Sequence, residues 1–275
     1  MVVHAQAVPR EALLDSEPVA VLCIGGKCIG KKPKQHFRAL EIKKHVLIDI
    51  FQCWDVLDAE VLHLRMASNA LAVWKSAPEF ICISYESPVS KPVPWSDAAA
   101  FQAVVSKLKT TDVLHLGNSS IVRYFNYFPK AVQLYGNRGV AGIDGSLSTA
   151  VGAALADPDR KHFLIIGDQS FLYDHNGLYG QKIPQNLIIC VLNNGVGGIF
   201  DWLPGTASTG PTAQRVFANA QHVNLKGIAS AFSVGYQAVS SVEALVEALD
   251  TAVGPKIIDS KTEQHVNLAA LAALR

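Results

Sequence analysis

Asp168 and Asn194 are the two residues whose types and spacing most clearly indicate chemistry. Asp168 follows the apolar run FLII and Gly167, and Asn194 follows the apolar run LIICVL and Asn193. Short β-branched runs without charges are typical of strands buried on both faces of a parallel sheet. Open α/β sheets bind their ligands at the carboxyl ends of such strands. A carboxylate and an amide oxygen that meet there suit a hard divalent cation that also binds phosphate oxygens.

Each of the two motifs alone is also compatible with a simple turn, because Gly-Asp often follows a strand and Asn-Gly is a common hairpin turn. The separation between them favours the cation site. About twenty residues lie between the two apolar runs, which is enough for the crossover that joins parallel strands. The same spacing resembles the thiamine-diphosphate motif, in which Gly-Asp and Asn-Asn frame a Mg²⁺–diphosphate site.

The hydrophobic pattern predicts two α/β regions in the 275 residues, after an N-terminal extension over residues 1–18. A small α/β unit is predicted for 19–76, with strands at 19–24, 45–50 and 61–66 and a helix from about Gly30 to Lys43. Residues 77–96 hold four of the thirteen prolines and are predicted to be a linker. Residues 97–275 are predicted to form a second α/β domain that opens with a helix capped by Ser96. Its predicted strands are 112–118, 163–166, 187–192 and 256–260, and the last is expected to close the sheet. Residues 135–156 are predicted to hold the end of a further strand, a glycine-rich turn and a helix from about Ser146.

The composition argues against several classes of protein. The net charge of +1 gives no basic excess that would favour nucleic acid or a membrane surface. No apolar run approaches the roughly 18 residues of a membrane span. The first residues lack the charged start and apolar block of a signal peptide, so a cytoplasmic location is expected. The five cysteines form no CxxC pair and are expected to be free thiols.

Four sequence blocks carry a specific resemblance: GNSSIVR (117–123), GNRGVAGIDGSLSTAVG (136–152), GDQSFLYDHNGL (167–178) and NNGVGGIF (193–200). They resemble the C-terminal half of the 2-succinyl-5-enolpyruvyl-6-hydroxy-3-cyclohexene-1-carboxylate (SEPHCHC) synthases, which are thiamine-diphosphate-dependent enzymes of menaquinone (vitamin K2) biosynthesis. The resemblance covers most of residues 19–260. It implies an α/β fold with mainly parallel open sheets and helices on both faces. Residues 97–275 would be the family's diphosphate-binding domain, and residues 19–76 would be part of its Rossmann-like central domain.

The resemblance also implies an activity. The family is a transferase that decarboxylates 2-oxoglutarate and adds the succinyl semialdehyde carbanion to isochorismate. Thiamine diphosphate and Mg²⁺ (or Mn²⁺) are the implied cofactors, and a homo-oligomer is the implied assembly. In the family, the glutamate that activates the cofactor lies in a pyrimidine-binding domain. The residues before 18 are too few to encode that domain. This sequence therefore offers no candidate for that catalytic residue, and the isolated chain is expected to be inactive or nearly so.

The family's positions assign roles to individual residues. The side chains of Asp168 and Asn194 and the backbone carbonyl of Val196 would bind the metal, and Ile143 would hold the cofactor bent. The other cofactor-binding residues implied are Gly142, Gly167, Gln169 and Ser170. Because the substrates carry several carboxylates, fixed cations are expected beside them. The implied substrate-binding residues are Asn118, Ser119, Arg123, Arg138, Lys31, Lys32, Ile199, Phe200 and Leu203, although the two lysines are also compatible with a solvated helix start.

Three positions depart from the family's pattern: Gln169 and Val196 stand where glycine is usual, and Ala141 stands where serine is common. Val196 would be strained if that position required a positive φ. Two other functions stay open from the sequence. The chain could be one subunit of a split carboligase whose partner brings the pyrimidine-binding domain, or a truncated, non-catalytic protein that binds cofactor or has a structural role. A different thiamine-diphosphate carboligase is disfavoured by the GNRGxxGIDG block.

Overall fold

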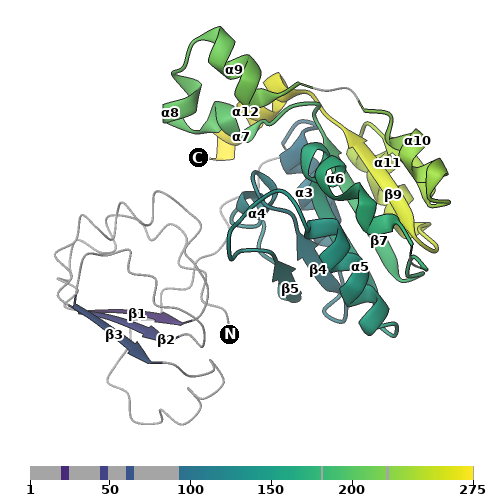
Figure 1. The fold of residues 1–275 in the computed structure, drawn as a ribbon, viewed down its shortest axis with the longest axis horizontal. Helices are drawn as coiled ribbons and strands as arrows, with labels where there is room; N and C mark the ends of the chain where they lie inside the picture. The colour runs from purple at the N-terminus through teal and green to yellow at the C-terminus, as the bar shows by residue number, and fades with distance from the viewer. Residues whose placement is uncertain are drawn as a thin grey trace. The chain divides into compact units, whose positions relative to one another are not determined.

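The computed structural model describes residues 20–24, 44–48, 60–64 and 93–274, apart from residues 181, 221 and 222. The chain divides into two compact units, residues 1–86 and 87–275 (Figure 1). This division falls inside the proline-rich segment, and the finer domain bounds given above stay predictions. Among the described residues, no helix is long and apolar enough to cross a membrane.

The first unit contains a sheet of three parallel strands: β1 (Ala20–Ile24), β2 (Lys44–Ile48) and β3 (Glu60–Leu64). Their order in the sheet is β1-β2-β3, so the three strands predicted for this region are confirmed to within two residues. The helix predicted from Gly30 to Lys43 lies outside the described residues, as do the candidate substrate ligands Lys31 and Lys32.

The second unit is built on six parallel strands. They are β4 (Val113–Leu116), β5 (Gln133–Gly136), β6 (His162–Gly167), β7 (Leu187–Asn193), β8 (Gly235–Val239) and β9 (Lys256–Lys261), in the order β5-β4-β6-β7-β9-β8. The prediction that the strand at 256–260 closes the sheet was wrong, because β9 lies between β7 and β8. The strand end predicted before the glycine-rich turn corresponds to β5, and the helix predicted from about Ser146 corresponds to α5. The edge strand β8 is only partly buried and lacks a continuous apolar run, so the hydrophobic pattern did not reveal it.

Helices pack on both faces of this sheet (Figure 1). On one face, α5 (Ser146–Ala156), α6 (Asp168–Asp174) and α10 (Leu225–Ala231) share a buried core with β6 and β7. On the other, α3 (Asp97–Lys107) packs against β7 and against α11 (Val242–Asp250). The remaining elements are α4 (Ile121–Tyr124), η2 (His175–Leu178), α7 (Ile199–Trp202), α8 (Pro204–Ala207), α9 (Pro211–Ala218) and α12 (Gln264–Leu274). The predicted α/β fold is confirmed for this unit.

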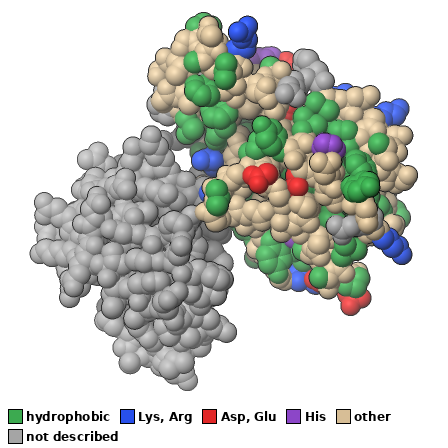
Figure 2. All heavy atoms as spheres, in the orientation of Figure 1, with side chains coloured by type: hydrophobic (Ala, Val, Ile, Leu, Met, Phe, Trp, Pro, Cys, Tyr) green, Lys and Arg blue, Asp and Glu red, His purple; other side chains and the backbone are tan. Residues whose placement is uncertain are grey.

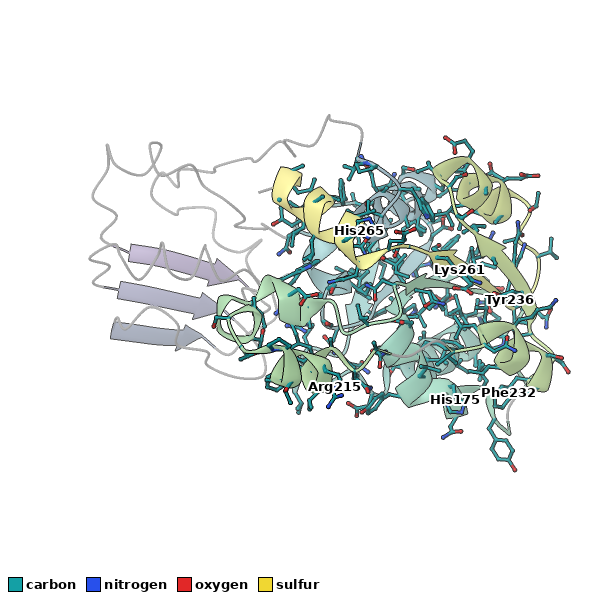
Figure 3. All side chains as sticks on the ribbon, turned by 90° about the horizontal axis from the view of Figure 1, so that it is seen from above. His175, Arg215, Phe232, Tyr236, Lys261 and His265 are labelled. Atoms are coloured by element: carbon teal, nitrogen blue, oxygen red, sulfur yellow. The ribbon has the colours of Figure 1, made fainter. Side chains whose placement is uncertain are left out.

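Aromatic contacts join elements that are distant in sequence. His175 of η2 and Phe232, which follows α10, meet edge to face with ring centroids 6.4 Å apart (Figure 3). Tyr124 of α4 packs against Phe101 of α3 at 5.9 Å and against Trp202 of α7 at 5.2 Å. The second set connects α3 to the two short helices α4 and α7, which follow β4 and β7 respectively.

The start of α3 is fixed by Ser96, whose hydroxyl accepts a hydrogen bond from the backbone N–H of Ala99 at 3.2 Å. This confirms the predicted N-cap. We expect Ser96→Ala to lower the free energy of unfolding by about 1 kcal/mol, because it leaves a helix N–H without its acceptor. Urea titration measures the change, and Ser106→Ala, which alters an exposed serine of the same helix, is the control. Equal losses in the two variants would contradict a specific capping effect.

The topology of the sheet places its ligand-binding edge between β4 and β6. From β4 the chain crosses to β5 on one side, and the next strand, β6, returns to the other side of β4. The loops that follow β4 and β6 therefore leave the sheet in opposite directions. A crevice forms at such a switch point, outside the carboxyl ends of the strands.

Candidate active site

A pocket of about 630 Å³ lies at this switch point. Its lining includes Asn118 and Ser119 after β4, Asp168 after β6, and Asn194 after β7. β6 and β7 are hydrogen-bonded neighbours with Gly167 opposite Leu192, so the two predicted metal-binding side chains start from adjacent strand ends. The structure thus brings Asp168 and Asn194 to one pocket.

Asp168 is a buried carboxylate, only 5% exposed. Its Oδ2 accepts a hydrogen bond from the backbone N–H of Gly195 at 3.0 Å, which links the ends of β6 and β7. The pKa of Asp168 is raised to about 7, mainly by burial and to a smaller extent by the nearby carboxylate of Asp97, while hydrogen bonds from backbone N–H groups act in the opposite direction. A bound cation would stabilise the ionised form of such a buried carboxylate.

Asn194 is held between two hydrogen bonds. Its Nδ2 donates to Oδ2 of Asp97 at 2.8 Å, and its Oδ1 accepts from the backbone N–H of Val196 at 3.0 Å. Asp97 also lines the pocket, and burial raises its pKa. The sequence reasoning did not identify Asp97, because an acidic residue in the first turn of a helix is normally explained by the helix dipole.

The loop after Asn194 accommodates the valine that stands where the family has glycine. Gly195 has a φ of 73°, whereas Val196 is not among the residues with positive φ. Only glycine adopts the left-handed conformation at little cost. The loop needs this conformation at Gly195, one residue before Val196, the position where the sequence departs from the family. Val196 lines the pocket without this strain.

The glycine-rich loop between β5 and α5 is tied to the pocket by Asn118. The side-chain Nδ2 of Asn118 donates to the carbonyl oxygens of Asn137 and Gly142, at 2.9 and 2.5 Å. Ile143 lines the pocket, and its carbonyl accepts a hydrogen bond from the hydroxyl of Ser170. The loop is thus fixed from both sides with Ile143 at the pocket.

Two residues beside this loop have a left-handed backbone without being glycine: Ser119, with a φ of 65°, and Ala141, with a φ of 66°. Such conformations cost on the order of 1–3 kcal/mol each and concentrate at functional sites. Ala141 is the position where the family commonly has serine.

Arg123 and Arg138 lie next to the pocket rather than in its lining. Arg123 donates to the carbonyl of Ser119, and Arg138 donates to Oδ1 of Asn118, so each contacts a residue that lines the pocket. Burial, and then the charge of Arg138, lower the pKa of Arg123; burial lowers the pKa of Arg138. The buried Nε of Arg138 has no hydrogen-bond partner, and within the described residues neither arginine forms a salt bridge. Two close, partly buried cations with no salt bridge to a carboxylate of the described residues suit an anionic ligand.

The other candidates divide between the pocket and its surroundings. Gly167, Gln169, Ser170, Ile199 and Phe200 line it. Gly142 and Leu203 are not among its lining residues, and Lys31 and Lys32 lie outside the described part of the chain. The roles given to all these residues stay predictions.

The sequence reasoning also missed an apolar side of the pocket, formed by α9. Val216 and Phe217 line the pocket and are 68% and 42% exposed, and the ring of Phe217 lies 5.6 Å from that of Phe200. Hydrophobic side chains are visible over α8 and α9 in Figure 2. α9 follows the last of the four sequence blocks, which ends at residue 200, so the resemblance gave no reason to assign this helix to the site.

The donor set around Asp168 fits a cation that shares its ligands with a phosphate-bearing cofactor. No group of three or more His, Cys, Asp or Glu side chains within the described ranges could hold a metal. A metal here would instead combine one carboxylate with amide and carbonyl oxygens, which is the chemistry expected for Mg²⁺ that completes its shell with phosphate and water. The buried carboxylates of Asp168 and Asp97, which interact with each other, supply the negative charge that such a cation neutralises.

A parallel α/β sheet with a carboxylate and an amide at adjacent strand ends defines a class of diphosphate-binding domains. Residues 116–261, over half of the chain, match the family model described as "Thiamine pyrophosphate enzyme, C-terminal TPP binding domain". The chain belongs to this family of thiamine pyrophosphate (thiamine diphosphate) enzymes.

Curated relatives narrow the comparison. Proteins named 2-succinyl-5-enolpyruvyl-6-hydroxy-3-cyclohexene-1-carboxylate synthase from Flavobacterium psychrophilum and Bacteroides thetaiotaomicron are 31% and 32% identical over 91% and 94% of this chain. A protein of the same name from Bacteroides fragilis is 33% identical over 88%. The matches cover 49%, 49% and 45% of those relatives, so the chain spans about half their length. The resemblance predicted from the four sequence blocks is confirmed.

Proposed function

We propose that this chain provides the diphosphate-binding half of the active site of a SEPHCHC synthase. The observation that carries the proposal is the meeting of Asp168 and Asn194 at the ends of adjacent strands, in a pocket that also contains Ile143. The names of the relatives support the particular reaction, a transfer from 2-oxoglutarate to isochorismate.

In this proposal Asp168, Asn194 and the carbonyl of Val196 hold a Mg²⁺ or Mn²⁺ ion, which binds the diphosphate of the cofactor. When bound, thiamine diphosphate supplies the chemistry by which a 2-oxo acid is decarboxylated and its remaining carbons are transferred. The protein supplies binding and orientation. Ile143 fills the space that would otherwise let the cofactor extend, and Ser170 fixes the backbone of Ile143 through its hydrogen bond to the carbonyl.

Arg123 and Arg138 are proposed to hold the carboxylates of the substrates. Both guanidinium groups contact pocket-lining residues through neutral acceptors, which leaves their charge available. Arginine binds carboxylates through two parallel hydrogen bonds, which fixes orientation as well as charge. Ile199, Phe200 and Leu203 are proposed to contact the ring of isochorismate, with Val216 and Phe217 extending this apolar side.

A second domain is proposed to complete the site. Asp97 and Asp168 are the acidic residues among the described residues that line the pocket, and no glutamate lines it. Asp168 is assigned to the metal and Asp97 is engaged by Asn194, so neither is placed to activate the cofactor's aminopyrimidine ring. We therefore propose that a pyrimidine-binding domain supplies the activating glutamate, and that turnover requires it.

Calorimetric titration with thiamine diphosphate, in the presence and absence of Mg²⁺, tests the proposal. We expect binding that depends on Mg²⁺, because the diphosphate and the two buried carboxylates repel each other until a cation lies between them. Thiamine without its diphosphate is the matched ligand control and is expected to bind with no dependence on Mg²⁺. Failure of the chain to bind thiamine diphosphate at millimolar concentrations with Mg²⁺ would contradict the proposal.

The loop geometry gives a sharper test of the metal-binding segment. We expect Gly195→Ala to lower the free energy of unfolding by about 1–2 kcal/mol, because the φ of 73° is unfavourable for a residue with a Cβ. The same variant is expected to weaken Mg²⁺-dependent cofactor binding, since it displaces the carbonyl of Val196. Val196→Gly is the control and is expected to leave that affinity nearly unchanged. A larger effect at 196 than at 195 would contradict the role given to Gly195. Denaturant titration and calorimetry measure the two quantities.

A further inference from the structure

We propose that Asp97 is a positioning residue that fixes the orientation of the Asn194 amide, so that its side-chain oxygen is presented for the metal. The inference rests on the proposed function for its purpose, which is metal binding by Asn194. The orientation itself follows from hydrogen bonds of the chain alone. Asp97 is the first residue of α3 and lies 97 positions before Asn194 in the sequence.

An ionised carboxylate can bind only the NH₂ end of an amide side chain. An ionised aspartate only accepts hydrogen bonds, whereas an asparagine side chain has a donating NH₂ end and an accepting oxygen of nearly the same shape. Oδ2 of Asp97 therefore selects the Nδ2 end of Asn194, which lies 2.8 Å away. Oδ1 of Asn194 is then directed to the opposite side, where it accepts from the backbone N–H of Val196 and keeps a further lone pair.

Asp97 is itself held rigidly enough to impose this choice. Its Oδ1 accepts from the hydroxyl of Thr262 at 2.5 Å, and its backbone N–H donates to Oδ1 of Asn267 at 2.8 Å. Thr262 is fixed in turn by donating its backbone N–H to the carbonyl of Asn193 at 3.0 Å. Trp95 adds an indole hydrogen bond of 2.7 Å to the carbonyl of Lys261, the last residue of β9, which is labelled in Figure 3. The segment between β9 and α12 thus clamps Asp97 beside β7.

A structural role at the start of α3 does not explain this arrangement. Ser96 already caps the helix through Ala99, and the Asp97 carboxylate accepts hydrogen bonds from the side chains of Asn194 and Thr262, which lie outside the helix. A carboxylate that is 2% exposed is costly to bury. Outer partners of this kind orient metal ligands, and their loss typically lowers metal affinity 10- to 100-fold.

The chain contains a matched pair for comparison one residue away. Asn193 donates its Nδ2 to Oδ1 of Asp259 at 2.9 Å, and Asp259 is 1% exposed. This pair has the same chemistry and comparable burial of its carboxylate, but neither residue lines the pocket. Removing the carboxylate from each pair therefore separates the loss of a buried hydrogen bond from an effect on the metal site.

The test measures the affinity for Mn²⁺ at a fixed high concentration of thiamine diphosphate, by electron paramagnetic resonance, and the thermal midpoint without cofactor. We expect Asp97→Ala to weaken Mn²⁺ binding roughly 10- to 100-fold. Asp97→Asn is expected to restore most of the affinity, because its amide can turn its oxygen toward Asn194 and its NH₂ toward Thr262. Asp259→Ala is expected to lower the thermal midpoint but leave Mn²⁺ affinity unchanged. Equal effects of Asp97→Ala and Asp259→Ala on the metal would overturn the inference.

A measurement on the unaltered chain covers the case in which Asp97→Ala does not fold. The side-chain NH₂ resonances of Asn194, assigned by their disappearance in Asn194→Asp, are expected to exchange slowly with solvent in the cofactor-free protein. Rapid exchange of both protons would overturn the orientation assigned to the amide. If the unaltered chain does not bind Mn²⁺, the proposed metal site and the role of Asp97 toward it are both wrong. The exchange measurement still decides whether Asp97 orients the Asn194 amide.

Discussion

Replacing Asp168 with asparagine is expected to weaken Mg²⁺-dependent binding of thiamine diphosphate by at least about 100-fold, more than the loss of an outer partner typically costs. The carboxylate is the charged member of the proposed ligand set, whose other members, Asn194 and the carbonyl of Val196, are neutral. An amide in its place keeps the shape and the hydrogen bond from Gly195 but removes the negative charge that favours a hard cation. Calorimetry with Mg²⁺ and cofactor measures the loss.

The same substitution is expected to stabilise the cofactor-free chain above neutral pH. Burial raises the pKa of Asp168 to about 7 from its ordinary value of 3.8. The folded state therefore binds the proton more tightly than the unfolded state, and the free energy of unfolding contributed by this group falls as the pH rises from about 4 to about 7. Above pH 7 the whole penalty is present, on the order of 2–4 kcal/mol. Asp168→Asn removes it, so the variant should be more stable than the unaltered protein at pH 8 and nearly equal to it at pH 4.

Asp174→Asn is the control, because it makes the same change at the other end of the same helix. The carboxylate of Asp174 accepts hydrogen bonds from the backbone and hydroxyl of Ser148 on α5, so its loss should lower stability without affecting the metal. Urea titrations at pH 4, 6 and 8 give the pH dependence. A destabilised Asp168→Asn variant at pH 8, or one that keeps Mg²⁺-dependent affinity, would contradict a buried carboxylate reserved for a cation.

The sequence predicted the parts of this site that depend on local pattern. β6 and β7 were predictable because strands buried on both faces need unbroken apolar runs, and Asp168 and Asn194 follow from where those runs end. The edge strand β8 was not, since it is only partly buried and no continuous apolar pattern is imposed on it. Ser96 was predictable as an N-cap because a cap acts within four residues of chain.

The features that were missed depend on contacts between distant segments. Asp97 reaches Asn194 only after β7 and β9 have paired and the chain beyond β9 has turned back over α3. The sequence left open whether Val196 is strained, because it replaces a glycine that is usual in the family. Only the structure shows that the positive φ belongs to Gly195 and not to Val196. Within the part of the chain that the structure describes, Arg123 and Arg138 form no salt bridge. This is likewise a property of packing, because carboxylates elsewhere in the sequence could have neutralised them.

The pair formed by Arg123 and Arg138 leads to the second large expected effect. We expect 2-oxoglutarate to raise the thermal midpoint of the chain in the presence of Mg²⁺ and thiamine diphosphate, because a ligand that binds only the folded state stabilises it by mass action. Arg138→Met is expected to weaken this binding by tenfold or more, since hydrogen bonds to a charged group are worth about 1.5–3 kcal/mol. Arg138→Lys should retain part of the affinity, because it keeps the charge but loses the two-pronged geometry.

The charge of the pair also makes a prediction for the protein without substrate. Burial and the charge of Arg138 both lower the pKa of Arg123. The two guanidinium groups therefore repel each other when no substrate is bound. Arg138→Met removes this repulsion and the buried Nε without a partner, so its thermal midpoint without ligand should be no lower than that of the unaltered chain even though Asn118 loses a donor. Arg160→Met is the control: Arg160 lies 3.6 Å from Asp157 and does not line the pocket. A midpoint shift with 2-oxoglutarate that survives in Arg138→Met, or disappears in Arg160→Met, would show that the pair does not bind the substrate's carboxylates.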